Sequence, residues 1–429
     1  MSILIKRATI LTQNSKRTQL QGDLYIEGQT ITEISSKPLT NEADYKIDGT
    51  DTLVMPGLIN THTHIPMTLL RGYADDMLLN KWLEERIWPV EAKLTKKTIG
   101  VGTRLGLLEM IASGTTSFLD MYFFEDTIAR ITKKAGLRGF LGVPIIDFGT
   151  PECTFEQLFP KADSFIKKWK NDSLITPLIA PHATYTCKPE NLQRSKELAD
   201  KHDVLLHMHC AETRDEVYNI QRRYGVRPVE QLKKYGLLSE RMILAHCGWI
   251  TKGEILDIKE GGAKVSHNPV SNMKIGTGGY TPIPELLEAR VPIGLGTDGA
   301  ASNNVLDMFD TMKFCALAHK QHRWDPTILP SQTVVDFATI GGATCLNRNK
   351  DIGSLEEGKR ADIILLDLHK PHLIPHHNLV SHLVYAAHGS DVNTTIANGT
   401  PLMVDRQFTT LDYEKTLADA ETCAKELTS

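Results

Sequence analysis

The regular alternation of strand-like and helix-like segments is the feature that most restricts the fold of this 429-residue chain. Short apolar runs are separated by longer stretches in which apolar residues recur with the period of a helix. Eight strands are expected at residues 54–64, 115–121, 138–147, 175–182, 204–210, 242–247, 263–268 and 291–298. Eight strand–helix units of this length predict an α/β fold of the (β/α)8 TIM-barrel type. A doubly wound open sheet is the alternative, because it shows a similar alternation.

The two ends of the chain resemble each other and differ from its middle. Residues 1–55 and residues from about 355 onward contain short β-rich pieces with turn signals, such as GDLYIEGQTITEIS and VNTTIANGTPLMV. Two separated β-rich ends can meet as one small β-sandwich. The predicted domains are therefore a first part of the sandwich at 1–55, the barrel at 56–354, and at 355–429 the second part with a terminal helix.

The composition is that of an ordinary globular protein, with 41% hydrophobic and 23% charged residues and a net charge of -4. We find no basic stripe, so polymeric nucleic acids and anionic membranes are poor candidates as partners. The first residues lack a signal-peptide pattern, and no apolar run has transmembrane length. The seven cysteines are scattered without a C-x-x-C pair. A zinc site built from cysteine thiolates is thus not expected. Cysteines that are not arranged as disulfide pairs favour a cytoplasmic location.

Polar and titratable residues fall at the ends of six of the eight expected strands. These ends read NTHTH, APH, HMHCAE, AHC, SHN and GTD. The active site of a TIM-barrel enzyme lies where the carboxyl ends of its strands meet. The sequence therefore predicts one site built from these six segments.

The first of these strand ends contains His62 and His64. Residues two apart on a strand point to the same side, so both imidazoles would face one space. Neutral imidazole nitrogens are good zinc ligands, and a catalytic zinc keeps one position open for water. The alternative interpretation is a pair of polar residues at the mouth of a loop.

The motifs PGLINTHTH, HMHCAET, LAHCGW, SHNPVSNMKIGTG and GTDGAASNN resemble those of the amidohydrolase superfamily. Together with THIPMTLLRGYADD they are more closely similar to the 5'-methylthioadenosine/S-adenosylhomocysteine deaminase family, over nearly the whole chain. The resemblance implies hydrolytic deamination of an adenine nucleoside to the inosine analogue and ammonia. The expected substrates are 5'-methylthioadenosine, S-adenosylhomocysteine, 5'-deoxyadenosine or adenosine.

The resemblance also implies the metal ligands, which are His62, His64, His209 and Asp298, holding one Zn2+ per subunit. His207 is the alternative to His209 as the third histidine ligand, because it lies two residues earlier on the same strand face. The family places a catalytic glutamate three residues after the ligand, and Glu212 fits that spacing from His209. His207 is then expected to support the site from behind.

Three residues are expected to move protons if the resemblance holds. Glu212 would donate to ring nitrogen N1 of the adenine, although a glutamate at a helix start is also explained by the helix dipole. Asp298 would accept a proton from the attacking water, whose pKa zinc lowers toward about 7. His246 would help to orient that water, or it is a buried structural histidine.

The same resemblance assigns the substrate contacts. Glu91 would hold the ribose hydroxyls, and His182, Glu212 and Asp298 would contact the bound nucleoside. Trp82 and Trp88 could form an apolar lid over the sugar or its 5' group, or pack in the core. The fourth strand ends without the lysine that binuclear relatives use, which favours a single metal.

The sequence departs from the family pattern after the third strand. Family members that handle a carboxylate on the 5' substituent can place an arginine there, because such pairing is bidentate and strong. Residues 147–159, DFGTPECTFEQLF, contain neither arginine nor lysine. The sequence therefore favours a less charged 5' end over the homocysteine tail.

The sequence leaves two other interpretations open. One keeps the fold but changes the substrate, giving a guanine or cytosine deaminase or a chloro-triazine hydrolase. The other is a scaffold protein without activity, which would have lost part of its ligand set, whereas all four expected ligands are present. A dimer or tetramer is possible, as in related enzymes.

Overall fold

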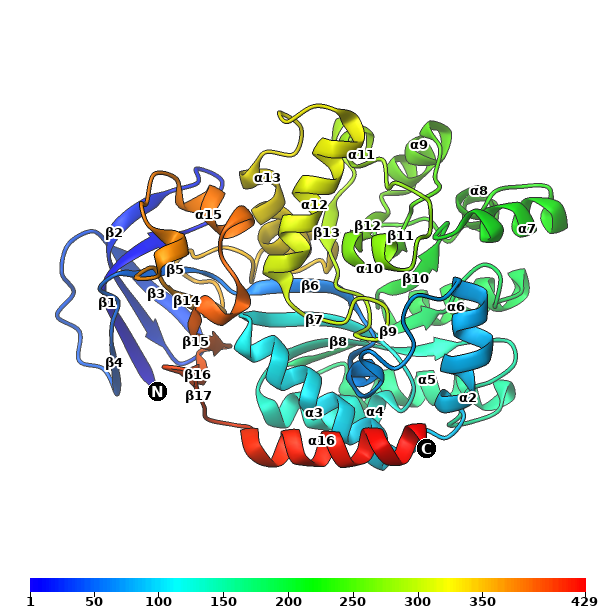
Figure 1. Cartoon of the computed structure of the whole chain (residues 1–429), viewed down its shortest axis with the longest axis horizontal. Coiled ribbons are helices and arrows are strands. Elements are labelled where there is room, and N and C mark those ends of the chain that lie inside the picture. The colour runs from blue at the N-terminus through cyan, green and yellow to red at the C-terminus, as the bar shows by residue number, and fades with distance from the viewer.

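The computed structural model describes the backbone of all 429 residues and every side chain except the one at position 80. Two sheets organise the chain, one from its middle and one from its two ends (Figure 1). The central sheet has eight parallel strands, and neighbours in the sheet are neighbours in sequence. They are β6 (Leu58–Thr63), β7 (Thr115–Met121), β8 (Arg138–Ile145), β9 (Ile175–Pro181), β10 (Leu206–Cys210), β11 (Met242–His246), β12 (Lys264–His267) and β13 (Ile293–Leu295).

The first and last strands of the central sheet meet and close it into a barrel. The amide of Asp298 donates to the carbonyl of His62 at 2.9 Å, and Thr61 Oγ1 donates to the carbonyl of Leu295 at 2.9 Å. The predicted (β/α)8 fold is confirmed by this arrangement. It brings the carboxyl ends of all eight strands to one rim.

Helices cover the outside of the barrel (Figure 1). The barrel helices are α3 (Lys96–Ala112), α4 (Glu125–Ala135), α5 (Phe155–Trp169), α6 (Pro189–His202), α7 (Arg214–Tyr224), α8 (Pro228–Lys234), α9 (Lys252–Gly261), α10 (Pro269–Lys274), α11 (Ile283–Glu288), α12 (Met308–Arg323), α13 (Ser331–Asp336) and α14 (Gly342–Cys345), with η3 (Phe337–Gly341) between the last two. Helix α9 shows how local sequence sets such bounds. Thr251 and Glu254 exchange the hydrogen bonds of a capping box at its start. Gly262, at φ 75°, ends it in the left-handed conformation that glycine adopts without strain.

The barrel strands are buried on both faces, because side chains fill the interior while helices cover the exterior. Every residue of β7, β8, β10 and β11 is buried. Large apolar side chains such as those of Phe118 and Phe140 are fully enclosed. The open rim is therefore the place where polar side chains from several strands can reach a ligand.

The second sheet joins the two ends of the chain. Its strands are β1 (Ser2–Leu11), β2 (Gln19–Glu27), β3 (Thr30–Ser35), β4 (Tyr45–Asp48), β5 (Thr52–Pro56), β14 (Ile363–Asp367), β15 (Val392–Ala397), β16 (Thr400–Val404) and β17 (Gln407–Phe408). Strand β5 lies between β1, to which it is parallel, and β14, to which it is antiparallel. Ile5, Leu24, Val54 and Leu365 belong to the separate apolar core of this sheet. The exact domain limits at residues 55 and 354 stay a prediction.

A buried ion pair connects this second sheet with the barrel. Arg138, at the start of β8, is 1% exposed and donates from Nε and Nη2 to the carboxylate of Asp362. Arg138 Nη2 also donates to Asn398 Oδ1 at 3.2 Å, and the amide of Asn398 donates to Asp362 Oδ1. The contact therefore joins residues far apart in the sequence.

Short helices and a C-terminal helix complete the chain. The segment between β6 and α3 forms η1 (Ile65–Leu70), α1 (Leu79–Trp82), η2 (Leu83–Ile87) and α2 (Trp88–Glu91), and we call residues 79–91 the lid segment. Near the C-terminus lie η4 (Pro371–Leu373), α15 (Leu379–Tyr385), η5 (Gly389–Asp391) and α16 (Tyr413–Thr428). Helix α16 runs along α3 (Figure 1), and the ion pairs Lys97–Glu426 and Arg104–Asp419 connect the two.

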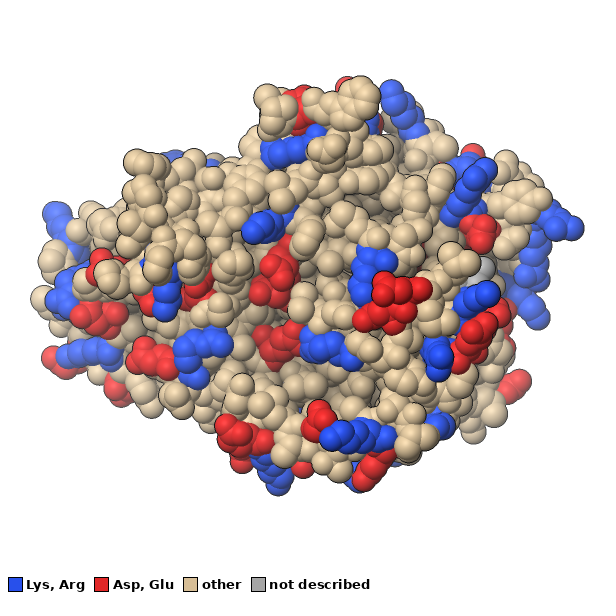
Figure 2. Space-filling view, in the orientation of Figure 1, with Lys and Arg blue, Asp and Glu red and all other residues tan. Residues whose placement is uncertain are grey.

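Charges of both signs are interspersed over the face shown in Figure 2. Charged side chains of this protein pair in many places, as Lys233 does with Asp257 at 2.7 Å and with Glu260 at 2.8 Å. Within the described part of the chain, no helix has the length and apolar character that crossing a membrane requires.

Candidate metal centre and active site

A cavity of about 410 Å³ opens at the carboxyl rim of the barrel. Of the ten residues that the sequence singled out, nine line this cavity, and the tenth, His62, lies fully buried beneath them. The nine are His64, Trp82, Trp88, Glu91, His182, His209, Glu212, His246 and Asp298. The structure thus brings together residues from the lid segment and from the ends of five barrel strands.

The buried histidines on strands β6 and β10 form a chain of hydrogen bonds that fixes their tautomers. His207 Nδ1 contacts the carbonyl of Ile243 at 3.1 Å and must donate to it. Its Nε2 is then the acceptor for His62 Nδ1, which lies 2.7 Å away. The remaining nitrogen of His62, Nε2, carries a lone pair and has no hydrogen-bond partner among the described residues. His207 does not line the cavity and supports His62 from behind.

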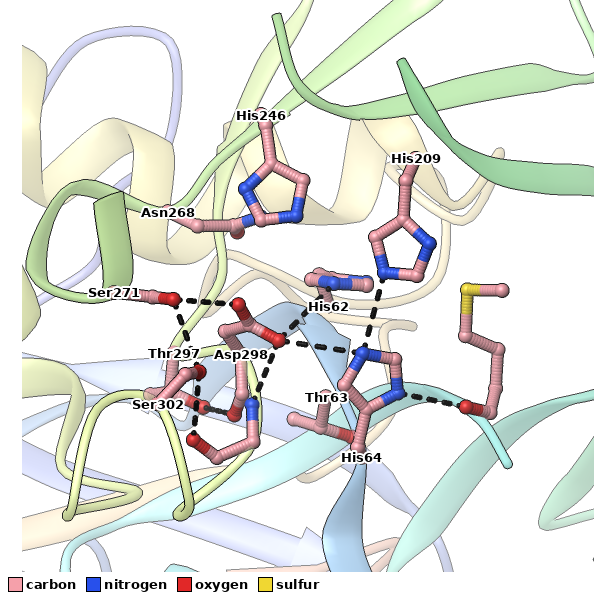
Figure 3. A network of polar contacts seen from close by, with 12 residues as sticks. His62, Thr63, His64, His209, His246, Asn268, Ser271, Thr297, Asp298 and Ser302 are labelled. Carbon is pink, nitrogen blue, oxygen red and sulfur yellow. Dashed lines mark hydrogen bonds and ion pairs between the residues drawn. The ribbon is translucent and has the colours of Figure 1, made fainter. Parts of the chain in front are cut away.

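His64 and His209 are oriented in the same way, each by a backbone carbonyl. His64 Nδ1 donates to the carbonyl of Met121 at 2.7 Å, and His209 Nδ1 donates to the carbonyl of His182 at 2.9 Å. Their Nε2 atoms therefore carry lone pairs, and these two atoms lie 3.2 Å apart (Figure 3). Burial keeps the pKa of both imidazoles below the ordinary value, so the neutral form prevails at pH 7.

His246 presents a fourth inward nitrogen from the end of β11. Its Nδ1 lies 2.8 Å from Asn272 Oδ1 and donates to it, and its buried Nε2 has no partner among the described residues. Burial lowers the pKa of His246, but the carboxyl groups of Glu212 and Asp298 outweigh burial and raise it above the ordinary value.

Asp298 follows β13 and faces the imidazoles (Figure 3). Its Oδ1 lies 3.4 Å from His62 Nε2 and 3.3 Å from His64 Nε2, and it accepts from the amide of Gly299 at 2.8 Å. Its Oδ2 accepts from Ser271 Oγ at 2.6 Å. Burial raises the pKa of Asp298, but the nearby imidazoles of His62, His64 and His246 more than offset burial and hold the pKa well below its usual range. The side chain is thus ionised.

These groups fit a divalent cation. The ligand atoms of His62, His64 and Asp298 lie within 4.8 Å of one another, as do those of His62, His209 and His246. A buried nitrogen or oxygen lone pair without a hydrogen-bond donor costs free energy. A cation bound between these side chains would pair with several such lone pairs at once. Imidazole nitrogens with one carboxylate form a donor set suited to zinc, and His62 belongs to both groups.

Glu212 lies beside this cluster, three residues after His209. Its Oε1 is 3.9 Å from His246 Nδ1, and its amide donates to Glu216 Oε2 at 2.8 Å. Burial, reinforced by Asp298 and opposed by His246, raises the pKa of the Glu212 carboxyl to about 7. A carboxyl group with this pKa can both give and take a proton at neutral pH.

The lid segment supplies the outer wall of the cavity. Glu91 is 9% exposed and lines the cavity together with Trp82, which is buried, and Trp88, which is 41% exposed. The Trp88 ring lies 6.4 Å from the ring of Phe148, which belongs to the loop after β8. Burial raises the pKa of the Glu91 carboxyl to about 7, although a hydrogen bond from Tyr122 opposes this effect. The wall thus combines aromatic surface with one carboxyl group.

His182 follows β9 and also lines the cavity. Its Nδ1 lies 2.9 Å from Thr186 Oγ1, and burial lowers its pKa to about 3, so it stays neutral at pH 7. A neutral imidazole can donate or accept one hydrogen bond to a bound ring.

The structure adds cavity residues that the sequence did not single out. Tyr122, Phe148, Tyr185 and Ser302 line the cavity, and Ser271 holds Asp298 in place. Tyr122 is the one that a strand-end rule would find, since it directly follows the last residue of β7.

The chain matches a known family over most of its length. Residues 53–402 match the model of the amidohydrolase family. The chain is 45% identical over 410 residues to a 5-methylthioadenosine/S-adenosylhomocysteine deaminase of Thermococcus onnurineus, covering 95% of both chains. It is 44% identical over 429 residues to a 5'-deoxyadenosine deaminase of Methanothermobacter thermautotrophicus, covering 100% of this chain and 99% of the other.

Solved structures share the whole fold. An adenosine deaminase from Xanthomonas campestris, with bound zinc, superposes with a TM-score of 0.95 at 35% identity, over 99% of this chain and 98% of that one. Atrazine chlorohydrolase from Arthrobacter aurescens, complexed with zinc, has a TM-score of 0.91 at 25% identity, over 98% and 100%. These neighbours and the donor set favour a divalent metal at the rim of the barrel.

Proposed function

The chain belongs to the amidohydrolase family, and from this premise we propose that it removes the 6-amino group of an adenine nucleoside by zinc-dependent hydrolysis. The products are the inosine analogue and ammonia. One observation carries the proposal. The His–Asp cluster shares a cavity with two buried carboxyl groups of pKa about 7, Glu212 beside the cluster and Glu91 in the lid segment.

One Zn2+ per subunit is assigned to His62, His64, His209 and Asp298. When bound, zinc lowers the pKa of the attacking water toward about 7. The orphaned Nε2 of His62 and the ionised state of Asp298 support this ligand set. A cytoplasmic location belongs to the same proposal and is supported by the seven free cysteines.

The residues of the chain would divide the proton transfers among themselves. Glu212 donates its proton to N1 of the adenine as water adds to C6. Asp298 accepts a proton from that water and passes it to the departing amino group, so that ammonia leaves neutral. His246 orients the water through its free Nε2. The hydroxyl proton returns to Glu212 when the C6 carbonyl forms.

The cavity favours a nucleoside with an uncharged 5' group. Glu91 can accept hydrogen bonds from the ribose hydroxyls, and the neighbouring aromatic rings of Trp88 and Phe148 line the same cavity. Among the described residues that line the cavity there is neither arginine nor lysine. A carboxylate on the 5' substituent would therefore lack a cation to pair with. We expect 5'-methylthioadenosine, 5'-deoxyadenosine and adenosine to be better substrates than S-adenosylhomocysteine.

A panel of nucleosides tests this proposal on the purified holoenzyme. Loss of the amino group is followed by ultraviolet absorbance, and zinc content is measured on the same sample. Uncharged 5' groups should give at least about tenfold higher kcat/KM than S-adenosylhomocysteine, the factor expected for one unpaired charge. Guanine, cytosine and a chloro-triazine serve as controls. Faster turnover of any of these three would overturn the assignment of an adenine nucleoside.

A further inference from the structure

Tyr122 is a buried residue of the cavity wall that the reaction outlined above leaves without a role. It is 5% exposed, and its hydroxyl donates to Glu91 Oε1 at 2.6 Å. We propose that Tyr122 is the positioning residue of the ribose-binding carboxylate, holding Glu91 so that its second oxygen faces the ribose hydroxyls. This inference rests on the proposed function, because it needs Glu91 to bind the ribose.

Glu91 needs such a support because of where it lies. It is the last residue of the four-residue helix α2, in a lid segment made of short helical pieces. Among the described residues, the Tyr122 hydroxyl is the single hydrogen-bond donor to the Glu91 carboxylate. A carboxylate has about four acceptor positions, so one phenol leaves enough of them for two hydroxyl groups. Without that phenol, rotation about the last side-chain bond of Glu91 would be unrestrained by any hydrogen bond.

Tyr122 can act as a support because its own backbone is fixed. Its amide donates to Oε1 of the buried Glu125 at 2.9 Å. Two residues on, the amide of Phe124 donates to Glu152 Oε2 at 2.9 Å. Two carboxyl groups thus hold the loop that follows β7, and the phenol projects from a rigid position.

The residue before Tyr122 links this support to the metal side of the cavity. The carbonyl of Met121 accepts the hydrogen bond that orients His64. Two consecutive residues therefore fix a candidate metal ligand and the candidate ribose acceptor to one stretch of backbone. This stretch sets the spacing between the two ends of the site, which must match the distance between the reacting carbon and the ribose.

The hydrogen bond also acts on the charge of Glu91. Burial raises the pKa of Glu91, and the Tyr122 phenol is the group that opposes this effect. Hydrogen bonding to the ionised form favours that form. Removal of the phenol should therefore raise the pKa of Glu91 further, in addition to freeing its side chain.

The test compares Tyr122→Phe with the wild-type holoenzyme on two substrates, an adenine ribonucleoside and its 2',3'-dideoxy counterpart. For the ribonucleoside we expect KM to rise about tenfold while kcat changes less than about twofold, as expected for one hydrogen bond to a charged group. For the dideoxy substrate KM should not change. The acid limb of the kcat/KM profile should move to higher pH with the ribonucleoside.

A double-mutant cycle separates positioning from a general structural effect. In a Glu91→Ala background, which removes the acceptor, Tyr122→Phe should add little, because a residue that acts through the side chain at position 91 has nothing left to position. Tyr280→Phe is the matched control, since Tyr280 donates to the carbonyl of Ala318 and does not line the cavity. Its kinetics should equal those of the wild type.

Two outcomes would overturn the inference. An equal loss on both substrates would show that Tyr122 supports the fold of the cavity in general, and no loss on either would show that Glu91 needs no support. Failure of the proposed function looks different, because the wild-type enzyme would then deaminate neither substrate.

Discussion

At the scale of single residues, Glu212 decides whether the proposed chemistry is correct. Replacement of Glu212 by Gln removes the transferable proton but keeps the size and a hydrogen-bond donor. We expect kcat to fall by roughly 10²–10⁴, the usual contribution of a general acid–base group. Bound zinc should not change, because the carboxyl is outside the proposed ligand set. Glu414→Gln on the exposed face of α16 is the control. Full activity of Glu212→Gln would refute its role.

The raised pKa of Glu91 leads to a pH prediction with a defined sign. The ionised carboxyl accepts the two ribose hydrogen bonds more strongly than the protonated one, and burial raises the pKa of this carboxyl to about 7. The kcat/KM of the ribonucleoside should therefore fall as the pH drops below about 7. An ordinary glutamate, with a pKa of about 4.3, would give no loss above pH 5 or so.

The variant Glu91→Gln checks this assignment, because its amide does not titrate. It should lower kcat/KM near neutral pH and flatten the acid limb. If the kcat/KM profile of Glu91→Gln falls at low pH as the wild-type profile does, the ionisation responsible for that fall belongs to another group.

The sequence predicted which residues meet in the cavity but not what orients them. All ten residues singled out lie at or beneath one cavity, because strand ends of a barrel converge by topology. The partners that fix the imidazoles are the backbone carbonyls of Ile243, Met121 and His182 and the side-chain oxygen Oδ1 of Asn272. Backbone carbonyls have no signature in a sequence. Tyr122 was missed because an aromatic residue after a buried strand is normally part of the core.

At the scale of elements, the expected barrel strands lie within a few residues of the observed ones, with one informative exception. The apolar pattern predicts a single strand over residues 54–64, yet this run contains β5 of the second sheet and β6 of the barrel. The chain changes sheets at Gly57, whose amide donates to the carbonyl of Asp362 at 2.9 Å. A Cβ at this position would lie 2.2 Å from the Thr116 side chain. Both strands are buried, so the apolar pattern shows no break between them.

The lid segment gives a prediction at the same scale. Trp88 is 41% exposed and Phe148 is 70% exposed, yet both line the cavity, so a bound ligand would cover apolar surface that is open without it. Trp88→Ala should raise KM about tenfold, which corresponds to roughly 1.4 kcal/mol, with little change in the melting temperature. Trp324→Ala, which removes a tryptophan that is 90% exposed and does not line the cavity, is the matched control. An unchanged KM for Trp88→Ala would place the substrate elsewhere.

At the scale of the whole molecule, stability depends on the ion pair that joins the two sheets. Arg138→Met would leave the Asp362 carboxylate, which is 4% exposed, without its guanidinium. Loss of one partner of a buried pair costs about 3–5 kcal/mol. We therefore expect the free energy of unfolding, measured by denaturant titration, to fall by that amount.

The control for this prediction is Arg323→Met, which breaks the partly exposed pair with Glu285. Exposed pairs contribute about 0–1 kcal/mol, so the midpoint of unfolding should hardly move. Restoring neutrality in the double variant Arg138→Met with Asp362→Asn should recover part of the loss. Equal stabilities of Arg138→Met and Arg323→Met would show that the joint between the sheets is not critical.

The position of β5 between β1 and β14 has a consequence for folding during synthesis on the ribosome. Pro56 ends β5, and its partner strand begins only at Ile363. At a synthesis rate of about 5–20 residues per second, a ribosome needs roughly 15–60 s to make the intervening chain. For that interval the edge of β5 that will face β14 is unpaired, and such edges invite association with other chains. The pairing of β5 with β14 can therefore form only after the whole barrel has been translated, which makes the closing of the second sheet a late step in the folding of this chain.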